Sequence, residues 1–194
     1  MNVPGRTRVP LHRRSVGAGP EPGRVNIESL IRVIPDFPIP GIAFRDITPL
    51  LHDPAGFRAT IDLFVDAFRD REIDAVVAVE ARGYMIGSAL AYALGAGFVP
   101  VRKPGKLPGS KRTESYALEY GTNSLEIHDD AMKRGERALV VDDLLATGGT
   151  AAATGRLLES IGADVVGYAF LIELVALGGR KALGDRPITA FISY

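Results

Sequence analysis

Short apolar runs alternate along the chain with segments whose apolar residues recur at helical spacing. The apolar run at residues 138–141 is typical of a buried strand, here predicted at 137–143, and residues 53–72 repeat apolar positions three or four apart after an Asp-Pro start. The same patterns predict strands at 74–79, 97–103 and 164–174, a short helix capped by Asn26 at 26–34, helices at 81–95 and 147–162, and a last short helix before residues 187–194. This alternation indicates a single α/β domain whose mainly parallel sheet is flanked by helices.

Two segments follow neither pattern. Residues 35–51 (PDFPIPGIAFRDITPLL) are interrupted by prolines, and residues 103–121 form a long polar excursion. We expect both to be irregular. Ligands of parallel sheets bind beyond the carboxyl ends of the strands, so the loops that follow the strands are where chemistry is expected.

Composition narrows the classes of function. The 194 residues contain 46% hydrophobic residues, 23 basic and 23 acidic residues, three histidines and no cysteine. Disulfides, thiolate catalysis and cysteine-based zinc sites are therefore excluded, and the scattered histidines give no metal-binding spacing. No apolar run approaches the roughly 20 residues that span a bilayer, and no signal peptide is recognisable. We expect a soluble, cytoplasmic protein without a membrane partner.

The balanced total charge hides a basic segment. Residues 1–24 are rich in Pro and Gly and carry five arginines against one glutamate. We interpret them as a disordered basic tail that precedes a domain at residues 25–194. A nucleic-acid role for this tail is the less favoured alternative to a solvated extension, so no nucleic-acid partner is expected.

The stretch VVDDLLATGGT places two acids at the end of an apolar strand. Asp142 and Asp143 are followed by Thr147, Gly148, Gly149 and Thr150, which open a helix. Glycine backbone N–H groups, a helix N-terminus and threonine hydroxyls together suit a phosphate. Two neighbouring carboxylates suit the hydroxyls of a diol. The combination predicts a ribose 5-phosphate site, and the missing Gly-Lys-Ser/Thr ending disfavours a P-loop.

This stretch resembles the phosphoribosyl-pyrophosphate motif of type I phosphoribosyltransferases. Four further segments resemble the adenine-specific branch of that family in the same order: residues 35–51, 80–87 (EARGYMIG), 99–109 (VPVRKPGKLPG) and 116–131 (YALEYGTNSLEIHDDA). The resemblance covers about residues 26–194. It implies the type I phosphoribosyltransferase fold, with a small N-terminal hood at about 26–50 and a flexible lid at about 105–120.

The resemblance also implies the reaction and its residues. These enzymes transfer the 5-phosphoribosyl group from phosphoribosyl pyrophosphate to adenine in purine salvage, giving AMP and pyrophosphate. By this resemblance, Asp142 and Asp143 would hold the ribose diol, and Ala146, Thr147, Gly148, Gly149 and Thr150 the 5′-phosphate. Pyrophosphate would be bound by Ala81, Arg82, Gly83, Arg102, Lys103 and Lys106, and adenine by Ala43, Phe44 and Arg45.

In the family the lid and an acid complete the site. Tyr116 and Tyr120 would line the lid, and Glu119 would act as the general base at the purine nitrogens. The alternative is that Glu119 is a solvated residue or only helps the lid to close. Mg²⁺ would be bound mainly through the pyrophosphate of the substrate, with no assigned protein ligand. The family also implies a homodimer.

Two other functions remain open at this point. A phosphoribosyltransferase for hypoxanthine, guanine or xanthine would share the phosphate motif, but the segment PGIAFRD is typical of the adenine type. A transcriptional regulator of the same fold would need a DNA-binding module, and the Pro- and Gly-rich tail is too short to form a helix-turn-helix.

Overall fold

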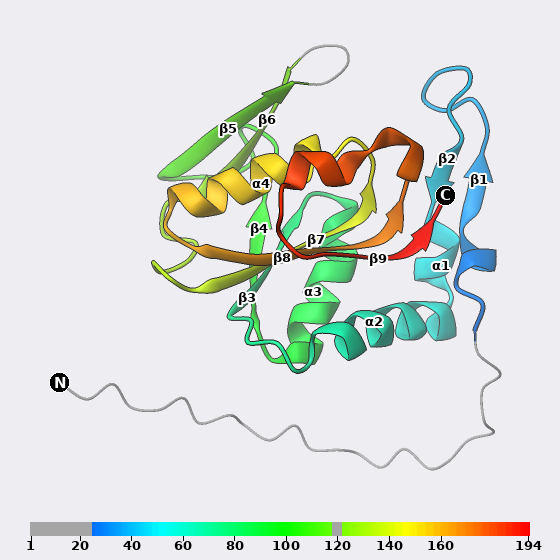
Figure 1. Cartoon of the computed structure of the whole chain (residues 1–194), viewed down its shortest axis with the longest axis horizontal. Helices are drawn as coiled ribbons and strands as arrows, with labels where there is room; N and C mark the ends of the chain where they lie inside the picture. The colour runs from blue at the N-terminus through cyan, green and yellow to red at the C-terminus, as the bar shows by residue number, and fades with distance from the viewer. Residues whose placement is uncertain (1–24, 118–121) are drawn as a thin grey trace.

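The computed structural model describes residues 25–117 and 122–194 of the chain. A five-stranded parallel sheet in the order β4-β3-β7-β8-β9 lies at its centre (Figure 1). Its strands are β3 (Ala75–Val79), β4 (Gly97–Val101), β7 (Arg137–Leu145), β8 (Asp164–Glu173) and β9 (Ile188–Ser193). The expected parallel α/β architecture is therefore confirmed.

Helices cover both faces of this sheet. The α-helices are α1 (Thr48–His52), α2 (Pro54–Phe68), α3 (Arg82–Leu94) and α4 (Gly149–Ser160), and the 3-10 helices are η1 (Glu28–Leu30), η2 (Val175–Leu177) and η3 (Gly179–Leu183). Figure 1 shows α2 and α3 on one side of the sheet and α4 on the other.

The alternation of side chains along each strand divides the apolar core in two. Val76 of β3 packs in one cluster with residues of α1, α2 and α3, whereas Val77 packs in the other with residues of α4. All five residues of β3 are buried. A strand that is covered on both faces must be apolar throughout. The sequence of β3 is therefore a continuous apolar run, which allowed the strand to be predicted.

Local signals fix where the helices begin and end. The carboxylate of Asp53 accepts a hydrogen bond from the backbone N–H of Gly56 at 2.6 Å, and Pro54 occupies the first turn of α2. Gly95 closes α3 in the left-handed conformation with φ of 66°. These ends place the N-terminus of α3 directly after β3, at the carboxyl edge of the sheet.

The polar excursion contains more regular structure than expected. Residues predicted as an irregular lid form strand β5 (Lys111–Ala117), which pairs antiparallel with β6 (Thr122–His128). Leu125 and Ile127 of β6 are buried in the core and anchor this hairpin to the sheet. The pairing satisfies backbone groups that a loop would leave to water. Glu119 and Tyr120 lie outside the described residues.

The expected helix at 26–34 is also shorter than predicted. Only η1 is helical, and the chain then continues as β1 (Arg32–Ile34), which pairs antiparallel with β2 (Phe44–Asp46). Two β-branched residues followed by Pro35 favour the extended conformation here. Arg32 and Asp46, which face each other in this register, form an ion pair. This two-stranded unit, with its connecting loop, lies within residues 26–50, where the hood is expected. None of the described helices has the length and apolarity needed to cross a bilayer.

Phe64 tests the role of the α2 face of the core. Its side chain is fully buried, and its ring lies 4.6 Å from that of Phe191 in β9. Replacing Phe64 by Ala should lower the free energy of unfolding by about 3–5 kcal/mol, because a large buried side chain is lost and a cavity remains. Leu63→Ala on the same helix, where the side chain is 38% exposed, is the matched control. Denaturant unfolding measures both, and equal losses would contradict this description of the core.

Candidate functional site

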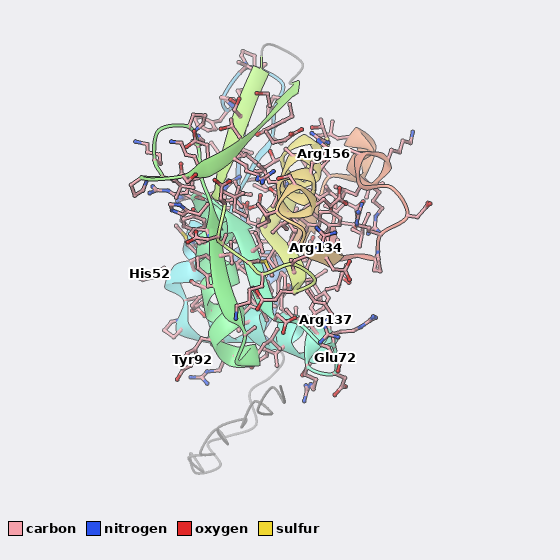
Figure 2. The ribbon with its side chains drawn as sticks, turned by 90° about the vertical axis from the view of Figure 1, so that its left-hand side faces the viewer. His52, Glu72, Tyr92, Arg134, Arg137 and Arg156 are labelled. Atoms are coloured by element: carbon pink, nitrogen blue, oxygen red, sulfur yellow. The ribbon has the colours of Figure 1, made fainter. Side chains whose placement is uncertain are left out.

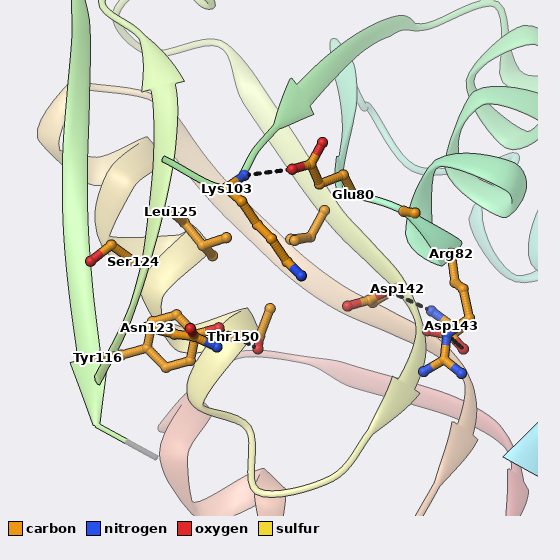
Figure 3. Close-up of a pocket in the computed structure, with 12 residues that line it drawn as sticks. Glu80, Arg82, Lys103, Tyr116, Asn123, Ser124, Leu125, Asp142, Asp143 and Thr150 are labelled. Atoms are coloured by element: carbon orange, nitrogen blue, oxygen red, sulfur yellow. Dashed lines mark hydrogen bonds and ion pairs between the residues drawn. The ribbon is translucent and has the colours of Figure 1, made fainter. Parts of the chain in front are cut away.

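A cavity of about 390 Å³ opens at the carboxyl edge of the sheet (Figure 3). It lies where β3, β4 and β7 end, and the β5–β6 hairpin and the first turn of α4 form its other walls. Its lining residues are Val79, Glu80, Ala81, Arg82, Lys103, Tyr116, Asn123, Ser124, Leu125, Asp142, Asp143 and Thr150. Seven of these are site residues that the sequence predicted individually: Ala81, Arg82, Lys103, Tyr116, Asp142, Asp143 and Thr150.

The paired acids lie at the bottom of this cavity. Asp143 is only 3% exposed, and the backbone N–H of Asp143 donates to the carboxylate of Asp142 at 2.9 Å. Burial and the neighbouring charge of Asp143 raise the pKa of Asp142 well above its ordinary value. Burial also raises the pKa of Asp143, although the guanidinium of Arg82 opposes this shift. Holding these two carboxylates together in ionised form therefore lowers the stability of the folded protein.

Arg82 connects the acids to the hood. Its Nε lies 2.9 Å from Oδ2 of Asp143, and its guanidinium carbon lies 4.9 Å from the centroid of the Phe44 ring. The next residue, Gly83, packs so closely that a Cβ there would lie 2.7 Å from a carboxylate oxygen of Asp142. A side chain at Gly83 would thus displace the acid, which explains the glycine after Arg82. The peptide bond that precedes Ala81 is cis.

The segment from Ala146 to Thr150 joins β7 to α4. Gly148 has a φ of 82°, and a Cβ at this position would collide with the backbone carbonyl of Gly179 in η3. Glycine is therefore required both for the backbone angle and for the close approach of η3. The hydroxyl of Thr150 lines the cavity and lies 3.0 Å from the phenol oxygen of Tyr116. The N-terminal turn of α4 is thus directed at the cavity, as an anion site requires.

The three predicted basic residues after β4 lie differently. Figure 3 shows the ammonium of Lys103 extending into the cavity. Arg102 instead donates from Nε to Glu80 at 2.8 Å and from Nη1 to the carbonyl of Lys106 at 3.0 Å. Lys106 is exposed and does not line the cavity. The structure brings Lys103 together with Arg82 and the acids, and it directs the guanidinium of Arg102 elsewhere.

In the hood, Phe44 faces the site through its contact with Arg82. The ring of Phe44 is half-buried and meets the edge of the Phe37 ring, with centroids 5.1 Å apart. The guanidinium of Arg45 stacks on the ring of Tyr194 at 3.8 Å, and Ala43 is exposed. The hood therefore presents one aromatic face next to the cavity, which is consistent with a planar ligand there.

Sequence reasoning did not single out several lining residues. Glu80 opens the segment at residues 80–87 and was assigned no separate role from the sequence, although its position directly after a buried strand could have indicated one. Asn123, Ser124 and Leu125 reach the cavity through β6, which places them opposite β5. No sequence pattern indicates which residues a hairpin turns towards a site. Within residues 25–117 and 122–194, no group of three or more acids or histidines could hold a metal ion.

Comparisons with known proteins agree with this geometry. Residues 46–186 match the model of the phosphoribosyl transferase domain. An adenine phosphoribosyltransferase of Acaryochloris marina is 58% identical over 170 residues, which cover 88% of this chain and all of the relative. That of Clostridium botulinum is 52% identical, covering 88% of this chain and 99% of the relative.

Solved structures give the same result. The adenine phosphoribosyltransferase of Thermoanaerobacter pseudethanolicus is 52% identical, with a TM-score of 0.85 over 87% of this chain and 98% of the other. The enzyme of Saccharomyces cerevisiae, solved with adenine and an imino-altritol bisphosphate, is 41% identical, with a TM-score of 0.81 over 85% and 96% of the two chains.

Replacing Asp142 tests the electrostatic cost of burying two adjacent carboxylates. Because its pKa is raised in the folded protein, its contribution to stability is complete below its ordinary pKa of 3.8 and is lost as the pH rises through the folded value. Asp142→Asn should therefore match the wild type near pH 4 and exceed it at pH 7. We expect a rise in Tm of about 2 °C or more, which about 1 kcal/mol produces in a chain of this size.

The control for this test is Asp143→Asn, since it removes the partner of Arg82 together with the repulsion. Its gain should be smaller than that of Asp142→Asn. Thermal melts of the ligand-free protein between pH 4 and pH 8 measure both variants. A gain for Asp142→Asn that does not depend on pH would show that repulsion and burial of this charge are not the cause.

Proposed function

This chain belongs to the adenine phosphoribosyltransferase family, and we propose that it transfers the 5-phosphoribosyl group from phosphoribosyl pyrophosphate to adenine. The products are AMP and pyrophosphate, so the reaction recovers a free purine base as a nucleotide. The observation that carries this proposal is that an acid pair, a helix N-terminus and two basic side chains converge on the same cavity. Together they match a diol, a phosphate and a pyrophosphate on one sugar.

The parts of the cavity suggest how the sugar would be held. The carboxylates of Asp142 and Asp143 would accept hydrogen bonds from the 2′- and 3′-hydroxyls, relieving the repulsion between the two acids. The backbone N–H groups from Ala146 to Gly149 and the hydroxyls of Thr147 and Thr150 would surround the 5′-phosphate at the N-terminus of α4. This arrangement fixes the anomeric carbon over the floor of the cavity.

Pyrophosphate would occupy the side of the cavity between β3 and β4. Arg82, the backbone of the 81–83 turn and Lys103 would be the donors, and the ammonium of Lys103 already extends into the cavity. Lys106, which is exposed, would approach only from outside. As the bond from the anomeric carbon to pyrophosphate breaks, these positive charges would stabilise the charge that develops on the leaving group.

Adenine would enter beneath the hood. Phe44 would stack on the purine, and the main chain of Ala43 and Arg45 would pair with its Watson–Crick edge. The guanidinium of Arg45 is directed at Tyr194, so its side chain leaves the main chain free to take this role. Main-chain recognition of an amino group and a ring nitrogen distinguishes adenine from 6-oxopurines, whose pattern of donors and acceptors is reversed.

The chemical step requires a proton acceptor at the purine. Adenine loses its N9 proton as N9 attacks the anomeric carbon, and we propose that Glu119 accepts it. Tyr116 and Tyr120 would line the lid that excludes water, since hydrolysis is the competing reaction at an oxocarbenium-like carbon. Tyr116 supports this role because its hydroxyl already lies at the rim of the phosphate loop.

Mg²⁺ is expected to accompany the pyrophosphate. The donor set fits an ion held mainly by the substrate, because the described cavity offers two adjacent carboxylates and no larger cluster of ligands. Asp142 and Asp143 would be its nearest protein groups, through water. The ion would neutralise charge on the leaving pyrophosphate when bound.

We further propose a homodimer in the cytoplasm. Several large apolar side chains remain exposed, including Phe37 in the hood at 51% and Tyr92 on α3 at 80%, and Figure 2 shows Tyr92 pointing away from the fold. Such residues are common at subunit interfaces. A cytoplasmic location follows from the substrate, since a sugar with several phosphate charges does not cross a bilayer unaided.

The proposed activity is tested with each purine base in turn. Purified protein is incubated with phosphoribosyl pyrophosphate, Mg²⁺ and adenine, hypoxanthine, guanine or xanthine, and the nucleotides are separated by chromatography. AMP should form rapidly, and the 6-oxopurines should react at least about tenfold more slowly, the effect of about 1.4 kcal/mol in the transition state. Equal turnover of hypoxanthine would remove the assignment to adenine. Failure with every base would favour a regulatory protein that only binds the sugar phosphate.

Glu119→Gln tests the proposed base. The substitution keeps the shape and hydrogen bonding of the side chain but removes the proton acceptor, so kcat should fall by about 10²–10⁴. Affinity for phosphoribosyl pyrophosphate should hardly change, since other residues bind it. If Glu119 only helps the lid to close, Glu119→Gln should retain near-normal turnover and Glu119→Leu should mainly raise KM. A kcat within about threefold of the wild type, far below the range for acid–base catalysis, would exclude the base role.

A further inference from the structure

Two largely buried carboxylates surround the turn that carries Lys103. Glu80 extends from the end of β3, and Glu126 lies on β6 of the hairpin. Their side chains are only 13% and 6% exposed. Buried acids are costly unless charged partners and hydrogen bonds compensate them. The contacts that stabilise these two acids therefore indicate what they do.

Glu80 makes two strong contacts with the chain after β4. One carboxylate oxygen accepts a hydrogen bond from the backbone N–H of Lys103 at 2.9 Å (Figure 3). The other accepts a hydrogen bond from Nε of Arg102 at 2.8 Å. Burial alone would raise the pKa of Glu80, but these hydrogen bonds and the charge of Arg102 bring it below the ordinary value. Glu80 is therefore ionised throughout the neutral pH range.

Glu126 fixes the same turn from the opposite side. Its carboxylate accepts the backbone N–H of Gly105 at 3.0 Å and pairs with the ammonium of Lys111 at 3.2 Å. Its main chain exchanges two hydrogen bonds with the main chain of Arg102. The backbone from Arg102 to Gly105 is thus held between β3 and the hairpin, and Lys103 projects from the middle of it.

The charge of Glu80 requires an explanation of its own. Glu80 lines the cavity in which we place pyrophosphate, and its carboxylate would repel that ligand. The guanidinium of Arg102 compensates this charge and is also bound to the carbonyl of Lys106. Arg102 consequently acts as a partner of Glu80, and Lys103 is the basic residue of this turn that faces the ligand.

We propose that Glu80 is a positioning residue for the reaction, which fixes the Lys103 ammonium in the pyrophosphate subsite and restrains Arg102 outside it. The inference rests on the proposed function, because it takes pyrophosphate as the ligand of this subsite. A positioned ammonium strengthens binding only if its backbone is already ordered before the ligand arrives. The carboxylate of Glu80 supplies that order.

A thermodynamic cycle between Glu80 and Lys103 tests the proposal. The affinity of Mg²⁺-pyrophosphate is measured by calorimetry for the wild type, Glu80→Ala, Lys103→Met and the double variant. Glu80→Ala should weaken binding by about tenfold or more, the effect expected when a hydrogen bond to a charged group is lost. In the Lys103→Met background the same substitution should change the affinity by less than about twofold, because the group that it positions is gone. Equal losses in both backgrounds would overturn the proposal.

Tyr84→Phe is the matched control for a merely structural effect. The Tyr84 hydroxyl donates to the carbonyl of Val101 at 2.9 Å and also interacts with Arg102. The variant therefore disturbs the same strand end while it leaves the hydrogen bonds of Glu80 to Lys103 and Arg102 in place. Its pyrophosphate affinity should equal that of the wild type. A loss as large as that of Glu80→Ala would show that any disturbance of the strand end is sufficient, and would also overturn the proposal.

Steady-state kinetics provides an independent readout. Glu80→Ala should raise KM for phosphoribosyl pyrophosphate by the same factor as the loss of pyrophosphate affinity and leave KM for adenine within about twofold, because the hood is untouched. An equal rise in both KM values would contradict a local role. If the proposed function itself is wrong, the wild type will neither bind pyrophosphate nor form AMP, and this result differs from every outcome that concerns Glu80 alone.

Discussion

The candidate site depends on the contact between Asp143 and Arg82. Two adjacent carboxylates at the end of a buried strand repel each other and resist desolvation, and their raised pKa values express that cost. The guanidinium of Arg82, 2.9 Å from Asp143, is the charge that offsets it. Because Arg82 also lies over Phe44, this one side chain contacts both the acids of the cavity and the aromatic ring of the hood.

Two glycines make this arrangement geometrically possible. Gly83 allows the first turn of α3 to approach Asp142, and Gly148 allows the loop before α4 to approach η3. In each case a Cβ would collide with a group of the neighbouring segment. The glycines therefore allow these segments to pack closely, in addition to any effect on the backbone angles of the turns. The site is therefore specified as much by the absence of side chains as by the charged residues that line it.

The fold and part of the site were predictable from sequence for a physical reason. β3 is covered on both faces, so its burial appears as a continuous apolar run, and Asp142 and Asp143 interrupt such a run where a parallel sheet binds ligands. The β5–β6 hairpin was not predicted, because β5 is polar and owes its structure to pairing with β6. The partner of Arg102 was also not predictable, since the pairing with Glu80 joins residues from different strands.

Thr150 shows how the hairpin and the phosphate loop are coupled. Its hydroxyl lies 3.0 Å from that of Tyr116 in β5, and Arg156 of the same helix pairs with Glu114 of the same strand at 2.6 Å. A hydroxyl can accept one hydrogen bond while it donates another. Thr150 can therefore accept from Tyr116 and donate to a phosphate at the N-terminus of α4. An anion in the loop would then orient the Thr150 hydroxyl towards itself and thereby strengthen its acceptance of the Tyr116 proton. The loop end of the hairpin, which carries Tyr116, would in this way be hydrogen-bonded to the same group that binds the ligand.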